Sequence, residues 1–332
     1  MQPKVSVIVP VYKTEKYIER CARSLFEQTM DEIEFIFVND CTPDNSINIL
    51  NNILKEYPQR AVQTTIINNK HNLGLAKNRI KGILAAKGEY IINCDSDDWV
   101  EKDAYRQLYE YAKSGDFDYV WCDYYRSDGK TSIHVKQECP TDSHTIISNL
   151  LTGISTSFIG TVWNRMFKRR LIEEHGIRCP EHSMHEDLVL SIQLTIHSKT
   201  IGYYPKPLYY YFYNPQSICV SADINSVLNR LDGSMANNEL ILKVLSENMD
   251  TACFKRQIEC KKFTCKEELL PVLEKSKKYR TMWKEIYPEV NDRITSNPYI
   301  PLRFKIQATL LLHNCYPLYT ILRKIHIFIK RP

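Results

Sequence analysis

Three aspartates stand close together directly after a short apolar run. The run is Tyr90-Ile91-Ile92, and the acids that follow are Asp95, Asp97 and Asp98. A bulky run of this kind is typical of a buried strand, and in open α/β sheets ligands bind beyond the carboxyl ends of the strands. Like charges so close together repel, and a divalent cation bound with substrate phosphates is one way to neutralise them. The stretch therefore predicts a metal and phosphate site.

A second interpretation fits the same spacing. An acidic turn often supplies an aspartate that caps the next helix, which here would begin near Lys102. The spacing by itself favours neither interpretation, so the elements that position the acids have to decide between them.

The composition is that of a globular protein with a large core. The residues are 43% apolar and 25% charged, which is typical of a globular protein. The length of 332 residues suggests one domain with an appendage or two domains. A formal net charge of +5 argues against a dedicated nucleic-acid binder. The apolar run near the start of the sequence, 5–9, is too short for a signal peptide, and the eleven cysteines form no CxxC pair. We therefore expect a cytoplasmic protein with reduced thiols.

Strands and helices alternate four times in about the first hundred residues. Apolar runs predict strands at 5–9, 34–38, 62–67 and 90–92. The helices between them are expected to begin near Thr14, near Thr42-Pro43 and after Asn72-Leu73-Gly74. Such alternation predicts a parallel α/β sheet whose loops gather along one edge. No G-x-G-x-x-G follows a strand, so a nicotinamide-binding domain is not expected.

The sequence after residue 100 predicts fewer regular elements. Residues 103–113 read as a helix, and 119–125 and 161–167 as strands. A helix is expected to open at His185-Glu186-Asp187, with two acids in its first turn, where the helix dipole favours negative charge. Cys179, His182 and His185 are three apart, but without a fourth nearby ligand they are a weak indication of zinc.

Taken together, these pieces resemble the family 2 glycosyltransferases. The matching segments are 7–12 (VIVPVY), 24–29 (SLFEQT), 37–46 (FVNDCTPDNS), 72–79 (NLGLAKNR), 95–98 (DSDD), 163–165 (WNR) and 186–187 (ED). The resemblance implies the GT-A fold, a Rossmann-like nucleotide-binding α/β fold with a mostly parallel central sheet, followed here by a helical C-terminal region. It also implies a nucleotide-sugar donor and a Mn²⁺ or Mg²⁺ cofactor. Asn39-Asp40-Cys41 departs from the usual Asp-Asp-Gly, and Arg165 replaces a frequent lysine.

The resemblance also assigns residues to the donor. Asp97 would bind the metal, and Tyr12 would stack on a pyrimidine ring while Asp40 accepts the N–H of uracil. Lys77 and Arg79, on the helix after residue 74, could meet the diphosphate, unless they belong to a solvated helix face. The nucleotide-binding residues are accordingly Pro10, Tyr12, Asp40, Arg79 and Asp95, and a UDP-sugar is expected.

A second group would serve the acceptor. Asp187 matches the family's catalytic base, which takes a proton from the attacking hydroxyl in a single, inverting displacement. Glu186 is the rival base and points about 100° around the helix. Trp163, Asn164 and Glu186 are candidate contacts to a sugar or to the acceptor, and a buried packing role is the alternative for the tryptophan.

The last thirty residues differ from the rest. Residues 303–332 carry six positive charges and no acid, and they are rich in leucine and isoleucine. Neither half reaches the ~20 apolar residues that cross a bilayer, so a basic amphipathic tail at the inner face of the membrane is expected. A helix packed on the protein is the alternative. The predicted domains are thus 1–215, 216–302 and 303–332.

These expectations combine into one function. We expect an inverting, metal-dependent glycosyltransferase that adds a sugar to a glycan or lipid-linked glycan in cell-surface polysaccharide synthesis. A non-catalytic scaffold that binds a nucleotide or glycan is the alternative, and a nucleotidyltransferase is a third interpretation.

Overall fold

The chain folds into two compact units. The computed structural model describes residues 2–138, 140, 142–153, 160–178, 180–214 and 223–329, with side chains as far as Arg323. One unit comprises Met1–Leu150 and Ser155–Gln216, and the other comprises Leu151–Ile154 and Ser217–Pro332. The first unit contains all the predicted site residues.

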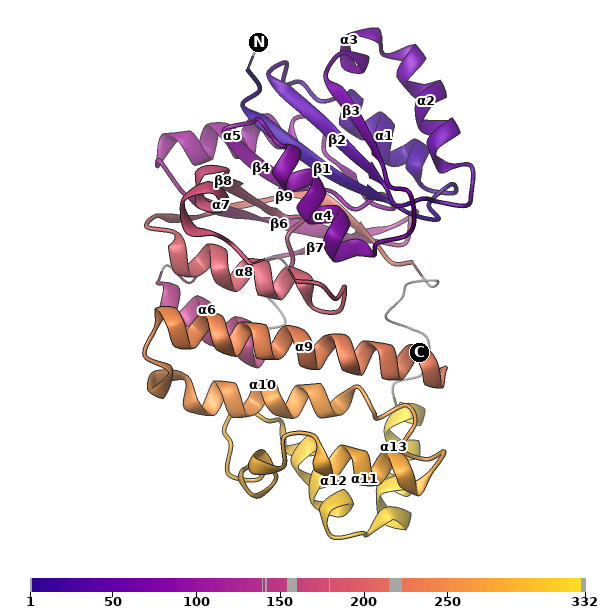
Figure 1. The fold of residues 1–332 in the computed structure, drawn as a ribbon, viewed down its shortest axis with the longest axis vertical. Helices are drawn as coiled ribbons and strands as arrows, with labels where there is room; N and C mark the ends of the chain where they lie inside the picture. Colours follow the sequence, from indigo (N-terminus) through magenta and orange to yellow (C-terminus); the bar gives the residue numbers. More distant parts are fainter. Residues whose placement is uncertain are drawn as a thin grey trace. The chain divides into compact units, whose positions relative to one another are not determined.

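The first unit is built on one sheet, which has nine strands within the described residues (Figure 1). Its order is β3-β2-β1-β4-β8-β6-β9-β5, and β7 pairs with β6. The strands are β1 (Val5–Val11), β2 (Ile33–Asn39), β3 (Thr64–Asn68), β4 (Tyr90–Asn93), β5 (Trp99–Val100), β6 (Tyr119–Ser127), β7 (Ser132–Val135), β8 (Arg165–Lys168) and β9 (Ile201–Phe212).

The first four strands are parallel and in register. Val11 at the end of β1 lies beside Asn39 at the end of β2, and Asn39 lies beside Asn68 at the end of β3. Ile8 pairs with Asn93, the last residue of β4. The loops after all four strands therefore share one edge. The predicted α/β fold with a parallel sheet is confirmed.

Two helical layers cover this parallel part. The helices of the unit are α1 (Ile18–Phe26), α2 (Ser46–Glu56), α3 (Pro58–Ala61), α4 (Leu75–Ala85), α5 (Ala104–Ser114), α6 (Ser143–Thr152), α7 (Arg170–His175) and α8 (Glu186–His197). The buried side of α1 joins Val5, Val7 and Val9 of β1 in one core, because alternate residues of a strand face the same way. On the opposite face, a Cβ on Gly82 of α4 would lie 2.2 Å from the Ile8 side chain, so a glycine is needed there.

The two first helices begin later than the sequence predicts. The main-chain carbonyl of Thr14 accepts from the Ile18 amide in a turn before α1. Before α2, the Asp44 carboxylate accepts from the amide of Ser46 and from the Thr42 hydroxyl. Because Asp44 draws these groups into a loop, Thr42 does not cap the helix and Pro43 is not its first residue.

The remaining strands extend the sheet in mixed directions. β8 is antiparallel to both of its neighbours, β4 and β6. β6 and β9 are parallel, with an irregular register between Cys122 and Tyr124, and β9 also pairs with β5. The chain thereby places β9 beside the segment that follows β4.

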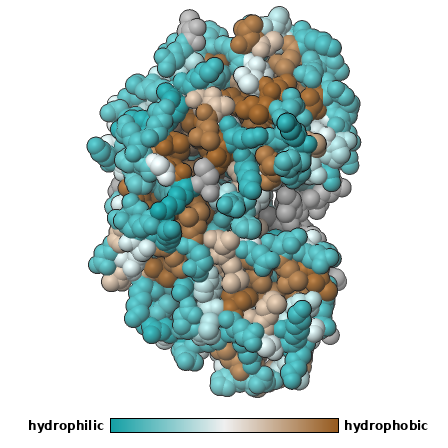
Figure 2. Space-filling model, in the orientation of Figure 1, coloured by the Kyte–Doolittle hydropathy of each residue, from teal (hydrophilic) through white to brown (hydrophobic). Residues whose placement is uncertain are grey.

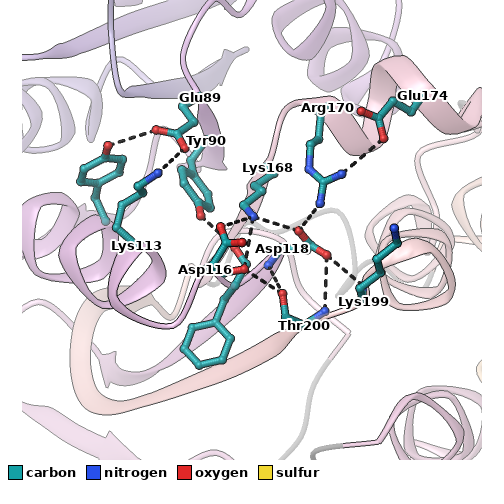
Figure 3. A network of polar contacts seen from close by, with 12 residues as sticks. Glu89, Tyr90, Lys113, Asp116, Asp118, Lys168, Arg170, Glu174, Lys199 and Thr200 are labelled. Atoms are coloured by element: carbon teal, nitrogen blue, oxygen red, sulfur yellow. Dashed lines mark hydrogen bonds and ion pairs between the residues drawn. The ribbon is translucent and has the colours of Figure 1, made fainter.

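An ionic network fixes the edge of the sheet opposite these loops (Figure 3). Asp118 is buried, and its carboxylate accepts from Arg170 at 2.6 Å and from the Lys199 amide at 2.9 Å. Lys168 lies between Asp118 and Asp116, with Nζ–Oδ1 distances of 3.1 and 2.7 Å. Burial alone would raise the pKa of Asp118, but the hydrogen bonds from Lys199, Lys168 and Arg170 lower it below its ordinary value.

This network leads to a prediction about stability. The variant Asp118→Asn is expected to lose about 1.5–3 kcal/mol of unfolding free energy at pH 7, because it removes the buried charge that accepts from Arg170 and Lys168, although Lys168 keeps Asp116. Since the native pKa of Asp118 is lowered, its contribution is present above pH ~4 and is lost as the pH falls through the native pKa. Urea titrations at pH 7 and pH 3 measure the difference. Asp116→Asn, on an exposed side chain, should cost no more than about 1 kcal/mol.

The second unit is helical. It contains α9 (Ile224–Asn248), η2 (Thr251–Phe254), α10 (Lys255–Glu267), α11 (Lys277–Glu285), η3 (Pro288–Arg293), α12 (Leu302–Leu312) and α13 (Tyr316–Ile329). These helices confirm the predicted helical C-terminal region. The core of the unit includes Val227, Phe263, Trp283 and Tyr319, and α12 and α13 contribute residues to it. Within the described residues no helix is long and apolar enough to cross a membrane.

Candidate active site

The acidic segment after β4 is anchored from within by Asp98. Its carboxylate is buried and accepts from the Tyr209 hydroxyl at 2.6 Å and from the Phe212 amide at 2.7 Å. Burial, followed by repulsion from Asp97 and Asp95, raises the pKa of Asp98 well above its ordinary value. α5 starts at Ala104 and receives no side-chain cap, so the helix-capping interpretation of these acids is wrong. Asp98 instead ties the segment to β9.

Asp95 and Asp97 are the half-buried members of the segment and reach solvent. The Asp97 carboxylate accepts from Asn214 at 3.1 Å, and burial followed by the charge of Asp95 raises its pKa. Within the described residues no three His, Cys, Asp or Glu side chains form a ready-made metal cage. Mg²⁺ usually binds one or two carboxylates together with substrate phosphates and water, and a partly open pair of acids in need of positive charge fits that chemistry. The zinc alternative includes Cys179, which lies outside the described residues.

Arg79 joins the acidic segment to the start of α8. Its guanidinium is buried and donates to Asp95 at 2.7 Å, and its Nε lies 3.5 Å from the Glu186 carboxylate. Burial would lower the pKa of Arg79, but the charges of Asp95 and Glu186 raise it, so the guanidinium stays protonated. The sequence predicts that Arg79 meets the diphosphate, whereas in the structure it bridges two carboxylates. Lys77, on the same helix, is exposed.

Two neighbouring acids open α8 with different environments. Glu186 is buried, and burial together with the charge of Asp187 raises its pKa to about 8. Asp187 is half-buried, and its carboxylate accepts from the Leu188 amide at 2.9 Å. Burial raises the pKa of Asp187 too, although Arg79 opposes the rise. A partly exposed carboxylate with a raised pKa is suited to take a proton from a bound hydroxyl.

The predicted nucleotide residues lie at the same edge of the sheet. Pro10 is buried in β1, and Tyr12 has a 39% exposed side chain with Lys13 5.2 Å from its ring centre. Asp40 is buried, and its carboxylate accepts from the amides of Leu73 and Gly74 at 2.7 and 2.9 Å. Tyr12 is therefore open to solvent at this edge, whereas Asp40 holds the loop before α4.

Comparison with known proteins identifies the family. Residues 6–176 match the model of Glycosyl transferase family 2, which is more than half of the chain. The chain belongs to this family. The resemblance seen in the sequence is confirmed.

Individual relatives agree with the family match. "Putative glycosyltransferase EpsH" of Bacillus subtilis is 36% identical over 228 residues, which are 65% of this chain and 62% of that protein. The matched part is thus less than two thirds of that relative. "S. aureus TarS 1-349 in complex with UDP" superposes with a TM-score of 0.68 at 17% identity, covering 98% of this chain and 92% of the other. "Mannosyltransferase PcManGT from Pyrobaculum calidifontis in complex with GDP-Man and Mn2+" has a TM-score of 0.55 at 16% identity, and the superposition covers 90% of this chain and 85% of the other. These two structures show the same fold.

Two residues of the family pattern have buried side chains. Trp163 is 4% exposed, and Asn164 is fully buried, where it donates to the Cys122 carbonyl and accepts from Thr161. Both side chains are closed to solvent, and their predicted contact with a sugar stays a prediction. Burial of the large apolar tryptophan explains its position.

Other residues at the site are missing from the predicted set. They are Arg20, which donates to the Asp97 carbonyl at 2.9 Å and stacks on Trp99, and Tyr209, Phe212 and Asn214 of the β9 segment. The sequence feature that could have pointed to the β9 residues is the unusual run of six tyrosines between residues 203 and 213. That run shows aromatic richness, but it gives no indication that β9 lies beside the acidic segment.

Proposed function

We propose that this family member is an inverting, metal-dependent glycosyltransferase. It transfers a sugar from a nucleotide diphosphate sugar to a hydroxyl of a glycan or lipid-linked glycan in cell-surface polysaccharide synthesis. The observation that carries the proposal is the Arg79 bridge, because it joins Asp95 of the acidic segment to Glu186, the neighbour of the candidate base Asp187.

Each residue has a task that its surroundings allow. Tyr12 offers an exposed ring to the base of the nucleotide, and Asp40 holds the loop before α4. UDP is the preferred nucleotide, supported by the UDP named in the TarS structure of the same fold. Asp97, with Asp95 beside it, would hold Mn²⁺ or Mg²⁺, whose contribution is to neutralise charge on the departing diphosphate.

The acceptor side is the task of α8. Asp187 takes the proton of the acceptor hydroxyl, which makes the oxygen a competent nucleophile. Burial and the charge of Asp187 raise the pKa of Glu186 to about 8, which lessens the negative charge that Glu186 places beside the base. A single attack on the face opposite the leaving group inverts the anomeric centre.

The proposal is tested with purified protein and a panel of nucleotide sugars, with Mn²⁺ or with EDTA. Release of the free nucleoside diphosphate that requires Mn²⁺ is the expected result. Binding without turnover would instead support the scaffold alternative, and pyrophosphate-linked products would support a nucleotidyltransferase.

The helical unit supplies a second part of the proposal, attachment to an anionic membrane surface. Leu302 and Ile306 of α12 and Leu318, Ile321 and Leu322 of α13 are exposed, at helical spacings that give each helix an apolar stripe. The segment from residue 303 onward has six cations and no acid. Apolar residues also reach the surface of this unit in Figure 2. Apolar contact with positive charge is the combination that binds anionic lipid interfaces.

Sedimentation with vesicles tests this part. The protein is expected to bind vesicles that contain phosphatidylglycerol and to bind pure phosphatidylcholine more weakly. A neutral surface lacks the electrostatic attraction of about 1 kcal/mol for each basic residue near an anionic surface. The variant Leu318→Ser/Ile321→Ser should bind several-fold more weakly, since it removes apolar area. Leu84→Ser, at a 71% exposed leucine of the other unit, is the matched control and should bind as well as the original protein. Equal binding by both variants would contradict the proposal.

A further inference from the structure

The segment that carries Asp97 forms a tight turn. The Asp98 amide donates to the Asp95 carbonyl at 3.0 Å, which closes a β-turn with Asp97 as its third residue. Tyr209 bonds both ends of this turn, because its hydroxyl accepts from the Asp95 amide at 3.0 Å and donates to the Asp98 carboxylate at 2.6 Å. Asp97 lies between these two ends. The direction of its side chain therefore depends on what holds the middle of the turn.

A side chain of the first helix, α1, holds the middle of the turn. The guanidinium of Arg20 donates to the Asp97 carbonyl at 2.9 Å. One helical turn further on, the Ser24 hydroxyl accepts from the Val100 amide at 3.3 Å. Residues four apart lie on one face of a helix. The same face of α1 thus bonds the main chain of the acidic segment at Asp97 and just after it.

Aromatic rings fix the guanidinium of Arg20. Its central carbon lies 3.6 Å from the ring centre of Trp99 and 4.7 Å from that of Phe212. Trp99 in turn stacks on Tyr210 at 4.9 Å, with an interplanar angle of 10°. A planar guanidinium can stack on rings and donate in a fixed direction, whereas the ammonium group of a lysine is a point charge on a flexible stem. The contact with the Asp97 carbonyl therefore calls for an arginine.

Arg20 also adds a positive charge near the acids. Burial lowers the pKa of Arg20, and the charges of Asp98 and Asp97 oppose this shift. A positive charge near Asp97 repels a cation, so loss of the charge alone would strengthen cation binding. Loss of the hydrogen bond to the Asp97 carbonyl would have the opposite effect if that bond orients the carboxylate. The two effects of Arg20 can therefore be told apart by their sign.

We infer that Arg20 is a positioning residue for the candidate metal site, and that it orients the Asp97 carboxylate by fixing the Asp97 carbonyl. The inference rests on the proposed function and adds to it a residue outside the predicted set. The carbonyl and the side chain of Asp97 share one Cα, so a fixed peptide plane limits the directions that the carboxylate can take. Groups that orient a metal-binding side chain in this way contribute to metal affinity without touching the ion.

Electron paramagnetic resonance of free Mn²⁺ tests the inference in the full chain. Mn²⁺ is titrated with UDP at a fixed concentration, and a protein-free sample accounts for the Mn²⁺ that UDP binds by itself. Arg20→Met and Arg20→Lys are both expected to weaken Mn²⁺ binding by about 10-fold, the lower end of the effect of a group that orients a metal ligand. UDP binding in EDTA, measured by thermal shift, should be unchanged in both variants, because no cation is bound there.

Arg23→Met is the matched control on the same helix. Arg23 pairs with Glu19 and Glu56 at 3.0 and 2.7 Å, so the variant removes a positive charge whose partners lie outside the acidic segment. It should bind Mn²⁺ as well as the original chain does. Arg20→Lys keeps the charge and most of the stem, so it tests the inference even if Arg20→Met is unstable.

Full Mn²⁺ affinity in either Arg20 variant would overturn the inference. In Arg20→Lys it would mean that a charge without the planar guanidinium is sufficient. Full or tighter binding in Arg20→Met would mean that Arg20 acts on the site by its charge alone or not at all. Failure of the proposed function is seen separately, because the original chain would then bind no Mn²⁺ beyond the protein-free sample, and the inference would fail with it.

Discussion

Replacing Asp187 with asparagine is expected to reduce sugar transfer by about 100- to 10,000-fold, the usual contribution of a general base. The amide keeps the size of the side chain but cannot take a proton. Donor binding should be unchanged, because the carboxylate bonds its own helix amide and is not among the predicted nucleotide-binding residues. Steady-state rates with the active donor, together with UDP titration by thermal shift, measure the two effects.

The matched control is Glu186→Gln, one residue away. Burial and the charge of Asp187 raise the pKa of Glu186 to about 8, and glutamine resembles the protonated form of this acid. Its rate should stay within a few-fold of the original at pH 7. If Glu186→Gln loses transfer and Asp187→Asn retains it, the two acids have exchanged roles.

The pH dependence adds an independent check on the base. Burial raises the pKa of Asp187, so at low pH the carboxyl is protonated and cannot accept a proton. The transfer rate should therefore rise with pH through that raised pKa and then level off. Asp187→Asn should remove this rise, and a profile that persists in the variant would show that another group is the base.

Replacing Asp97 with asparagine is expected to lower metal-dependent turnover by at least about 100-fold. A bound cation is worth several kcal/mol of transition-state stabilisation, and each 1.4 kcal/mol is a factor of ten. The neutral amide removes the charge that would hold the ion. The rate is measured over a range of Mn²⁺ concentrations.

Thermal unfolding separates loss of metal binding from loss of fold. Without metal, Asp97→Asn should be at least as stable as the original chain at pH 7, because the native pKa of Asp97 is raised by burial and by Asp95. A raised carboxyl pKa means that ionisation disfavours the folded state, so this penalty grows as the pH rises above the unfolded value of about 3.9. Mn²⁺ should raise the Tm of the original chain and not that of the variant. Asp103→Asn, just outside the site, should respond like the original, and a Mn²⁺ response retained by Asp97→Asn would move the ion elsewhere.

The local pattern of the chain was sufficient for the parallel half of the sheet. Apolar runs at 5–9, 34–38 and 90–92 are long enough to be strands, and the crossover rule then orders their loops on one edge. This is why Tyr12 and Asp95 could be placed together from sequence. Helix starts were less accurate, because the side chain of Asp44 competes for the amides that a cap would bind.

The sequence by itself determined the family, the α/β fold and the set of acids that could do chemistry, because strand periodicity and motif spacing are local properties. Only the tertiary structure decided what these groups contact. Arg79 meets Glu186, which is 107 residues later, and Asp98 meets Tyr209, which is 111 residues later. The strand order that makes these pairs places β9 beside β6 and the loop after β4. Burial then fixes which acids stay open to a ligand, since desolvation depends on the packing of the whole unit and leaves no trace in the spacing of residues.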